Sequence, residues 1–390
     1  MLCVIVKQQN IAHNSNNKLL IPEAKHDSTK TNNSLPMFAS MELLPNKEKS
    51  AHASAIVAKD SRLMVLFYAG EREGAPDVKI YQSFLDLSND KSSKNKYLWS
   101  DSKILLTPEM LTNLSGRFIK KLGNPIVFKD SKERVHLFVV GVSLGGWATS
   151  RIYQFYFSDD LKHIHYVREL HLNPFANYSH LVRTPGLPLK NGGFILPFSH
   201  EMWHKFPLIA FFDSNGNMLF TKRINKLKAQ LQPSIIAITP KDCIGLYRTN
   251  NRYNTNTYYQ TCTDYGHKWN DVEKSNIHNY DSSLVLVNIG NEVILITNDG
   301  KHNPLWHNNK DKGDRQSLSI YWLKYKIKGQ FVYLDTIDTA KKGGEVSYPS
   351  AVVYNDLLHV AYTYNRKTIK HVAINLQTIF NKIKAAKDNL

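Results

Sequence analysis

Tyr348-Pro-Ser-Ala-Val-Val353 runs through a short polar turn into Leu357-Leu-His-Val-Ala-Tyr362, and this pair of apolar segments is the unit that decides the fold. Both segments have the length and composition of strands, and Asn355-Asp356 between them suits a tight hairpin. The unit occurs six times. Its opening segments are His52–Val57, Gly123–Phe128, Arg183–Leu189, Gln232–Ala237, Asp281–Leu286 and Tyr348–Val353. The second segments are Leu63–Tyr68, Val135–Val140, Phe194–Phe198, Ile244–Tyr247, Val293–Ile296 and Leu357–Tyr362.

The spacing of these openings leaves room for a four-stranded antiparallel blade in each repeat. Six blades that close into a ring leave no long strand edge exposed. The sequence therefore predicts an all-β fold, a six-bladed β-propeller over residues 46–375. Residues 1–45 are polar and are expected to form a loosely ordered extension.

A short basic helix or tail is predicted for residues 376–390. Leu376, Ile379, Phe380 and Ile383 have the spacing of one helix face, with lysines outside it. We expect this face to pack against the propeller, and basic contact with a membrane surface is the alternative.

The chain is strongly basic, with 50 Lys+Arg against 33 Asp+Glu and a formal net charge of +17. Such a charge favours anionic partners, which include nucleic acids, acidic glycans and membrane surfaces. Lysines are spread along the whole chain, so an unspecific basic surface is an equal alternative. Nucleic-acid binding has only the net charge behind it, and we expect no nucleic-acid partner.

Cysteine is scarce, with Cys3, Cys243 and Cys262. No metal-ligand spacing and no glycine-rich phosphate loop occur, so no metal and no cofactor are expected. Cys243 and Cys262 fall on consecutive predicted strands and could pair, although we expect two buried free thiols. The apolar run Met1–Val6 is too short for a signal peptide, and no transmembrane stretch is visible.

One rim of the predicted propeller gathers charged and polar residues. In an antiparallel hairpin, the start of the first strand and the end of the second lie at the same rim. Several arginines that converge there with a tyrosine and carboxylates describe an anion-binding pocket. The residues at this rim are His52, Glu71, Arg72, Asn124, Trp147, Arg183, His200, Glu201, Gln232, Arg248, Asn298, Arg315, Tyr348 and Tyr364.

Several motifs carry a family resemblance. The segment from His52 to Asp77 resembles the first blade of bacterial sialidase-like proteins with BNR repeats, in the sialidase (neuraminidase) superfamily. Further segments fit the same group in order: Gly123–Pro125, Gly145–Trp147, Phe198–Glu201, Gln232–Ser234, Ser347–Ser350 and Thr368–His371. Cys262-Thr-Asp-Tyr-Gly-His-Lys-Trp269 is similar to the Asp-box turn, with Cys262 in place of Ser or Thr.

The resemblance implies a set of functional residues. In sialidases three arginines hold the substrate carboxylate, an Asp is the acid/base, and a Tyr assisted by a Glu attacks the anomeric carbon. By resemblance Arg248 and Arg315 stand for the second and third arginines. Asp77 stands for the acid/base, and Tyr348 for the nucleophile.

Other positions depart from the family pattern. His52 occupies the place of the first arginine and would be a weaker, pH-dependent cation. Arg72 is similar to an arginine that meets another face of the sugar. The expected Glu partner of the tyrosine is missing, because Gln230 and Gln232 stand there, and Glu201 or Glu345 are its expected substitutes. Arg183 and Gln232 complete the expected substrate-binding residues.

These residue types suit one class of substrate. Sialic acid and Kdo carry a carboxylate on the anomeric carbon, which two arginines can bind through bidentate hydrogen bonds. A neutral Tyr is not repelled by that carboxylate, whereas an Asp or Glu nucleophile would be. The sequence predicts an exo-glycosidase that releases such a sugar from a glycan or a lipopolysaccharide.

Two other functions stay open. The first is a catalytically degraded propeller that binds acidic glycans or a protein partner, and the second is an enzyme acting on another uronate-containing polysaccharide. The expected partner is an acidic glycan or glycolipid, with peripheral contact to a membrane surface. The oligomeric state and the compartment are left open, with a periplasmic or envelope location as the working expectation.

Overall fold

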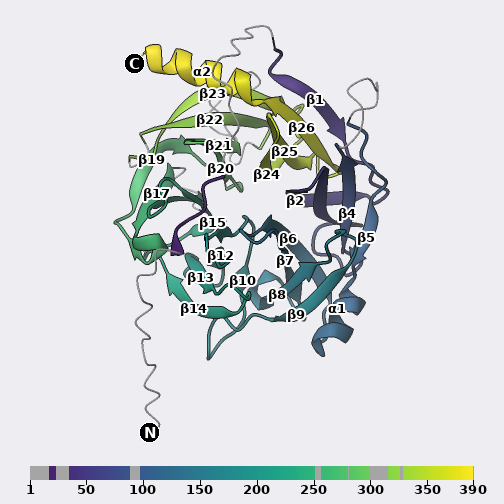
Figure 1. Ribbon diagram of the computed structural model, residues 1–390. Coiled ribbons are helices and arrows are strands. Elements are labelled where there is room, and N and C mark those ends of the chain that lie inside the picture. Colours follow the sequence, from purple (N-terminus) through teal and green to yellow (C-terminus); the bar gives the residue numbers. More distant parts are fainter. Residues whose placement is uncertain are drawn as a thin grey trace.

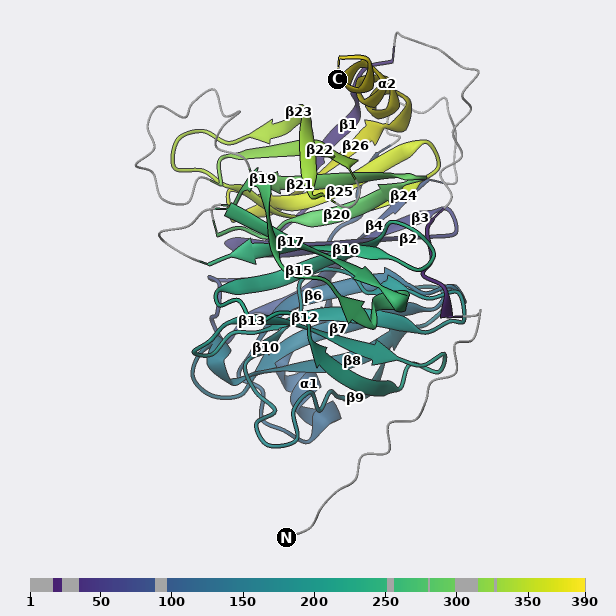
Figure 2. The ribbon, with the colours of Figure 1, turned by 90° about the vertical axis from the view of Figure 1, so that its left-hand side faces the viewer.

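Six antiparallel sheets stand around a central axis in this computed structural model (Figure 1). The structure describes residues 17–22, 35–87, 97–250, 256–279, 281–298, 315–325 and 328–389. Cys3 and most of the expected N-terminal extension lie outside these residues. The chain is an all-β six-bladed propeller of four-stranded antiparallel blades, as predicted. Seen from the side, the blades succeed one another around the ring (Figure 2).

The strands of each blade are arranged from the axis outward, and in blades three and four one strand position is shared by two short segments. Blades one to three contain β2 (Ser50–Lys59), β3 (Arg62–Gly70), β4 (Lys79–Asp86) and β5 (Lys103–Leu106); β6 (Lys121–Lys129), β7 (Val135–Val142), β8 (Ser150–Phe157) and β9 (Ile164–Glu169); and β10 (His180–Leu181), β11 (Leu187–Pro188), β12 (Phe194–His200), β13 (Phe206–Phe212) and β14 (Met218–Arg223).

Blades four to six follow the same plan. They contain β15 (Gln230–Ala237), β16 (Cys243–Thr249), β17 (Asn256–Thr263), β18 (Lys268–Trp269) and β19 (Glu273–His278); β20 (Val285–Ile289), β21 (Glu292–Asn298), β22 (Ser317–Tyr325) and β23 (Gln330–Thr339); and β24 (Val346–Tyr354), β25 (Leu357–Tyr364), β26 (Thr368–Asn375) and β1 (Phe38–Leu43).

The core lies between neighbouring blades. β3 and β7 are buried along almost their whole length because each is covered on both faces by the adjacent blades. Apolar side chains of blades one and two form one cluster, and those of blades five and six form another that includes α2 (Leu376–Asp388). Burial of this kind holds the six sheets in one ring.

Ring closure corrects the expected boundary at residue 45. β1 pairs antiparallel with β26, with Ser40 opposite Ala373 and Glu42 opposite His371, so the N-terminal segment supplies the outer strand of the sixth blade. Without β1, β26 would present an unpaired edge. No local pattern indicates this pairing, because the two strands lie near opposite ends of the chain.

Local departures from the prediction have backbone causes. The expected strand at Arg183–Leu189 is broken, and only Leu187–Pro188 of it pairs with β12, because Pro185 lacks an N–H for the ladder. The fifth blade begins at Val285 rather than at Asp281. An additional helix, α1 (Pro108–Ser115), follows the N-cap residue Thr107, whose hydroxyl accepts a hydrogen bond from the Met110 N–H at 3.1 Å.

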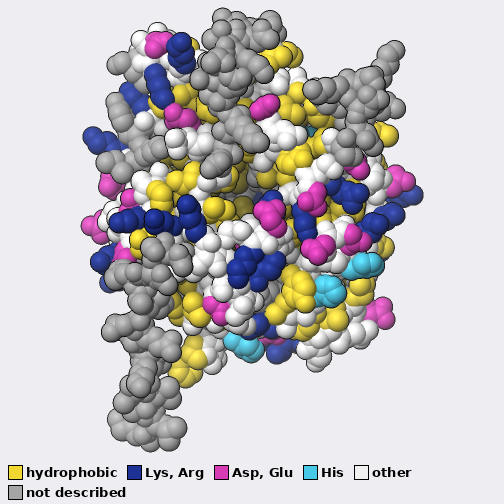
Figure 3. Space-filling model, in the orientation of Figure 1, with side chains coloured by type: hydrophobic (Ala, Val, Ile, Leu, Met, Phe, Trp, Pro, Cys, Tyr) yellow, Lys and Arg dark blue, Asp and Glu magenta, His cyan; other side chains and the backbone are white. Residues whose placement is uncertain are grey.

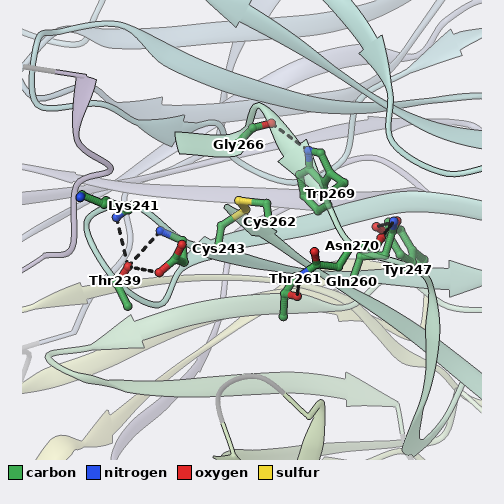
Figure 4. The surroundings of a disulfide bond; sticks show 11 residues. Thr239, Lys241, Cys243, Tyr247, Gln260, Thr261, Cys262, Gly266, Trp269 and Asn270 are labelled. Carbon is green, nitrogen blue, oxygen red and sulfur yellow. Dashed lines mark hydrogen bonds between the residues drawn. A yellow bond between two sulfur atoms is a disulfide. The ribbon is translucent and has the colours of Figure 1, made fainter. Parts of the chain in front are cut away.

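Cys243 and Cys262 form a disulfide, which corrects the expectation of two free thiols (Figure 4). The two residues lie directly opposite each other on β16 and β17, and both are fully buried. Trp269 of β18 lies opposite Cys262, and its indole N–H donates to the Gly266 carbonyl at 2.9 Å. The pairing was open from sequence because register decides whether two strand cysteines face each other.

The C-terminal helix α2 packs on the propeller, as predicted. Leu376, Ile379 and Ile383 are buried against blades five and six. No helix among the described residues has the length and apolarity to cross a bilayer.

A buried histidine pair in the sixth blade gives a prediction for acid stability. His359 Nδ1 lies 3.0 Å from His371 Nε2, and burial lowers the pKa of His359 to about 4. An unfolded histidine titrates near pH 6.5, so below that pH the unfolded chain binds protons that the folded chain does not. The free energy of unfolding should therefore fall as the pH drops from 6.5 towards 4, by about 2 kcal/mol at pH 5 for His359, and His371, whose pKa burial also lowers, acts in the same direction.

Urea unfolding of the wild type and of a His359→Gln/His371→Gln variant at pH 7 and pH 5 measures this contribution. The variant should lose less stability between the two pH values than the wild type loses. Equal losses would show that the pair does not titrate in this range.

Candidate active site

β-Bulges in three inner strands shape the centre of the site. The register shifts between His52 and Ala55 in β2, between Leu231 and Ser234 in β15, and between Ser347 and Ser350 in β24. Each bulge holds one residue in the left-handed region, with φ of 56° at Ala53, 46° at Gln232 and 56° at Tyr348. Bulges re-aim side chains, and here they place Tyr348 among residues of other blades.

Tyr348 meets the end of the fourth blade. Arg248, at the end of β16, donates from Nη1 to Tyr348 Oη at 2.8 Å and from Nε to Asp281 Oδ1 at 2.7 Å. Asn250 Nδ2 donates to the other carboxylate oxygen of Asp281 at 2.8 Å. Burial disfavours the charged forms of Arg248 and Asp281. Even so, the Arg248 guanidinium lowers the pKa of Asp281, and Tyr348 and Asp281 raise the pKa of Arg248.

Arg315 continues the network into the fifth and sixth blades. Its Nη2 donates to the Asp281 carbonyl at 2.5 Å, and its Nη1 donates to Glu345 Oε1 at 3.2 Å. Arg366 donates from Nε to Glu345 Oε2 at 2.6 Å and also contacts Glu73 of the first blade. Burial would raise the pKa of Glu345, but Arg315, Arg366 and the Ser347 hydroxyl lower it overall.

Three guanidinium groups surround the Tyr348 ring. The Cζ atoms of Arg183, Arg248 and Arg315 lie 5.1, 5.9 and 5.4 Å from its centroid. The structure thus brings Tyr348, Arg248 and Arg315 together, as their rim positions predicted, and their roles toward a substrate stay predictions. Arg248 and Arg315 are each paired with a carboxylate, those of Asp281 and Glu345, and Tyr348 itself is 7% exposed.

His52 does not supply a cation, which corrects that expectation. It is 1% exposed, its ring lies 4.1 Å from that of Tyr348, and its Nδ1 is 2.9 Å from Thr363 Oγ1. Burial, reinforced by four nearby arginines, holds its pKa well below the usual value, so the ring is neutral. The bulge in β2 explains why His52 does not take the expected position. In β2 it is Ala53, not His52, that occupies the position equivalent to Tyr348 in β24.

The other predicted substrate-binding residues differ in accessibility. Arg183 and Gln232 are almost fully buried, at 2% and 3% exposure, and the Gln232 Oε1 has no partner among the described residues. Arg72 is exposed in the loop between β3 and β4. Asp77 is exposed at the end of the same loop, and its Oδ2 accepts from the Glu71 N–H at 2.7 Å. Within the described part of the chain, no contact joins Asp77 to Tyr348.

Glu201 and Glu345, the two candidate partners of the Tyr348 phenol, differ in their hydrogen bonds and in the direction of their pKa shifts. Glu201, just after β12, accepts from the Ser199 hydroxyl at 2.9 Å, and burial raises its pKa although Arg248 opposes the shift. Glu345 is held by two arginines. We expected one of them to reach Tyr348 directly or through water, but the partner of Tyr348 Oη among the described residues is Arg248.

Sequence reasoning missed two members of the site. The repeat pattern indicates Asp281 only as the opening of the fifth blade, and no motif of the sequence indicates Arg366. Asp281 opens its repeat as the other predicted rim residues do, so the argument that strand starts and strand ends share one rim could have identified it. Arg366 lies in the turn between β25 and β26, where a single sequence gives no signal for its bond to Glu345.

Comparisons with known proteins agree with the fold. The family model of the BNR repeat-like domain matches residues 61–360. No curated protein matches the chain. Among solved structures, a protein of unknown function from Dyadobacter fermentans is 13% identical, with a TM-score of 0.66, and the match covers 87% of this chain and 100% of that one.

Two enzymes of known activity have similar structures. Trypanosoma rangeli sialidase with the inhibitor DANA is 12% identical, with a TM-score of 0.62 over 90% of this chain and 61% of that one. Penicillium chrysogenum α-L-arabinanase with arabinobiose is 11% identical, with a TM-score of 0.59 over 88% and 99%. At such identities the likeness shows a shared fold, and this chain spans under two thirds of the trypanosomal enzyme.

Proposed function

The chain belongs to the BNR repeat-like family, and on that premise we propose that it is an exo-glycosidase of the sialidase type. Its substrate would be a glycan or lipopolysaccharide ending in a 2-keto-3-deoxy sugar acid, sialic acid or Kdo. The observation that carries the proposal is the bond between Tyr348 Oη and Arg248 Nη1, with Arg315 beside the same ring. A phenol beside two arginines suits a sugar whose anomeric carbon bears a carboxylate.

Arg248 and Arg315 would hold the carboxylate. Their side chains are 12% and 18% exposed, so each guanidinium is largely desolvated but not sealed. Asp281 fixes both, through its carboxylate on Arg248 and its carbonyl on Arg315. Donors held in place before the substrate arrives bind a carboxylate without the cost of reorganisation.

Tyr348 would attack the anomeric carbon, and its proton needs an acceptor. Glu201 suits this role better than Glu345, because Glu345 is locked in ion pairs that lower its pKa, whereas burial raises that of Glu201. Glu201 also acts electrostatically on Arg248, which bonds the phenol. The proton would pass from Oη to the Glu201 carboxylate as the glycosyl–tyrosine bond forms and the bond to the leaving oxygen breaks.

Asp77 would protonate that leaving oxygen. Its loop follows β3, and the exposed Arg72 in the same loop would meet another face of the sugar. Water would then release the sugar acid from Tyr348, which is the retaining course.

Hydrolysis assays test the proposal. Purified protein should release free sugar acid from a sialyl-glycoside or from Kdo-terminated lipopolysaccharide core, and a neutral arabinan and a uronate polymer serve as comparison substrates. A crystal soaked with sialic acid or Kdo should place the carboxylate between Arg248 and Arg315. Release of neither sugar, together with no carboxylate at the arginines, would refute the proposed function.

A binding module without catalysis is the second candidate. Two observations favour it: among the described residues neither Glu201 nor Glu345 bonds the Tyr348 phenol, and the Asp77 carboxylate accepts a hydrogen bond from its own loop. Under this alternative the soak shows the carboxylate at the arginines while the assays show no release.

The basic charge supports an acidic glycan or glycolipid as the partner. On the face shown in Figure 3, Lys and Arg side chains are interspersed with Asp and Glu, including over the region of β2 and β4. A mixed surface of this kind favours a local site for the anion over a broad basic patch.

A further inference from the structure

Arg183 makes an unusual connection across the centre of the propeller. It follows β10 of the third blade, yet its guanidinium donates to backbone carbonyls of the first and sixth blades. Nη1 donates to Ser54 O at 3.2 Å, and Nη2 donates to Tyr348 O at 2.5 Å and to Pro349 O at 3.1 Å.

These carbonyls belong to two β-bulges. Ser54 lies in the bulge of β2, and Tyr348 and Pro349 form the bulge of β24. Residues in a bulge leave the regular ladder, and buried carbonyls without a ladder partner need another donor. One guanidinium donates to both bulges at once, and its 2.5 Å bond to the Tyr348 carbonyl is shorter than the 3.3 Å bond that the Ser54 hydroxyl makes to the same oxygen.

The conformation of Tyr348 depends on such support. Its φ of 56° is an outlier for a bulky aromatic residue and costs on the order of 1–3 kcal/mol, so it persists only where the surroundings enforce it. Arg183 holds the backbone of Tyr348, and Arg248 holds its phenolic oxygen. The residue is therefore fixed at both ends.

Arg183 is badly placed to bind a substrate itself. It is 2% exposed, and two of its nitrogens are occupied by backbone carbonyls. No carboxylate pairs with it among the described residues. Burial lowers its pKa to about 10, so it still carries its charge at neutral pH.

We propose that Arg183 is a positioning residue, which holds the bulge of the sixth blade so that the Tyr348 phenol stays against Arg248. It does not contact the substrate carboxylate, contrary to the role expected from its rim position. This inference rests on the proposed function for its kinetic consequence, whereas its structural consequence is independent of any activity.

The test compares Arg183→Met, which keeps the length but loses the donors, with Arg183→Lys, which keeps the charge. The matched control is Arg134→Met. Arg134 lies in the turn between β6 and β7, at the other rim, and its guanidinium also donates to a backbone carbonyl, that of Gly192, at 3.0 Å. For Arg183→Met we expect kcat to fall about 100-fold, as for a small displacement of a reacting group. The Kd for the free sugar acid should stay nearly unchanged, the Lys variant should recover part of kcat, and the control should keep full activity.

Two results would overturn the proposal. A rise in Kd as large as the fall in kcat would make Arg183 a ligand of the substrate. A crystal structure of Arg183→Met in which Tyr348 Oη keeps its 2.8 Å contact with Arg248 would show that no positioning occurs. If the wild type releases no sugar acid, the crystal structure alone decides, and loss of that contact in the Met variant supports the role of Arg183 while the proposed function fails. If Arg183→Met does not fold, the Lys variant is used for both measurements.

Discussion

Tyr348→Phe is expected to reduce turnover by several orders of magnitude while the propeller stays folded. The change removes one oxygen and keeps the ring, which packs against His52 and lies near three guanidinium groups. Without that oxygen no covalent glycosyl–tyrosine bond can form, so the route through two easier steps is lost. The loss should appear in kcat, because Arg248 and Arg315 still hold the substrate carboxylate.

A second tyrosine controls for the loss of a buried hydroxyl. Tyr259 Oη donates to Glu273 Oε2 at 2.8 Å on the outer part of the fourth blade, and Tyr259→Phe should leave turnover unchanged. Mass spectrometry with a fluorinated sugar acid should label the wild type on Tyr348. Near-normal hydrolysis by the Tyr348→Phe variant would exclude the nucleophile role.

Arg248→Ala is expected to cost about 2–5 kcal/mol of substrate affinity, or a comparable amount of kcat/KM. The guanidinium bonds both the Tyr348 phenol and the Asp281 carboxylate, and it is largely buried. Its removal takes away one half of the carboxylate clamp and leaves the Asp281 carboxylate without its closest cation, which repels the substrate anion. Arg248→Lys should recover little, because a point charge cannot copy the two-pronged contact.

The matched control breaks an equivalent ion pair elsewhere. Arg134 contacts the fully buried Asp130 at 2.6 Å, so Arg134→Ala should lower the free energy of unfolding without changing affinity. Calorimetric titration with the free sugar acid measures the affinity of each variant. An Arg248→Ala variant that binds as tightly as the wild type would place the carboxylate elsewhere.

The sequence by itself determined the fold, because that information is local. Each hairpin carries its own apolar alternation and turn residues, and Tyr348–Tyr362 alone contains a complete example. Repetition of such a unit leaves few arrangements other than a closed ring. The sequence likewise predicted that Arg248, Arg315 and Tyr348 lie close together, because in an antiparallel hairpin the start of the first strand and the end of the second lie at the same rim.

Only the tertiary structure decided what depends on distant partners or on a single register step. β1 closes the ring against β26 from the far end of the chain, and the disulfide depends on Cys243 and Cys262 being in register. The β-bulges in β2 and β24 place the neutral His52 ring beside the Tyr348 ring and present backbone carbonyls to which Arg183 donates. One added residue in a strand re-aims the side chains around it, and a strand pattern read from sequence does not show where such a residue is accommodated.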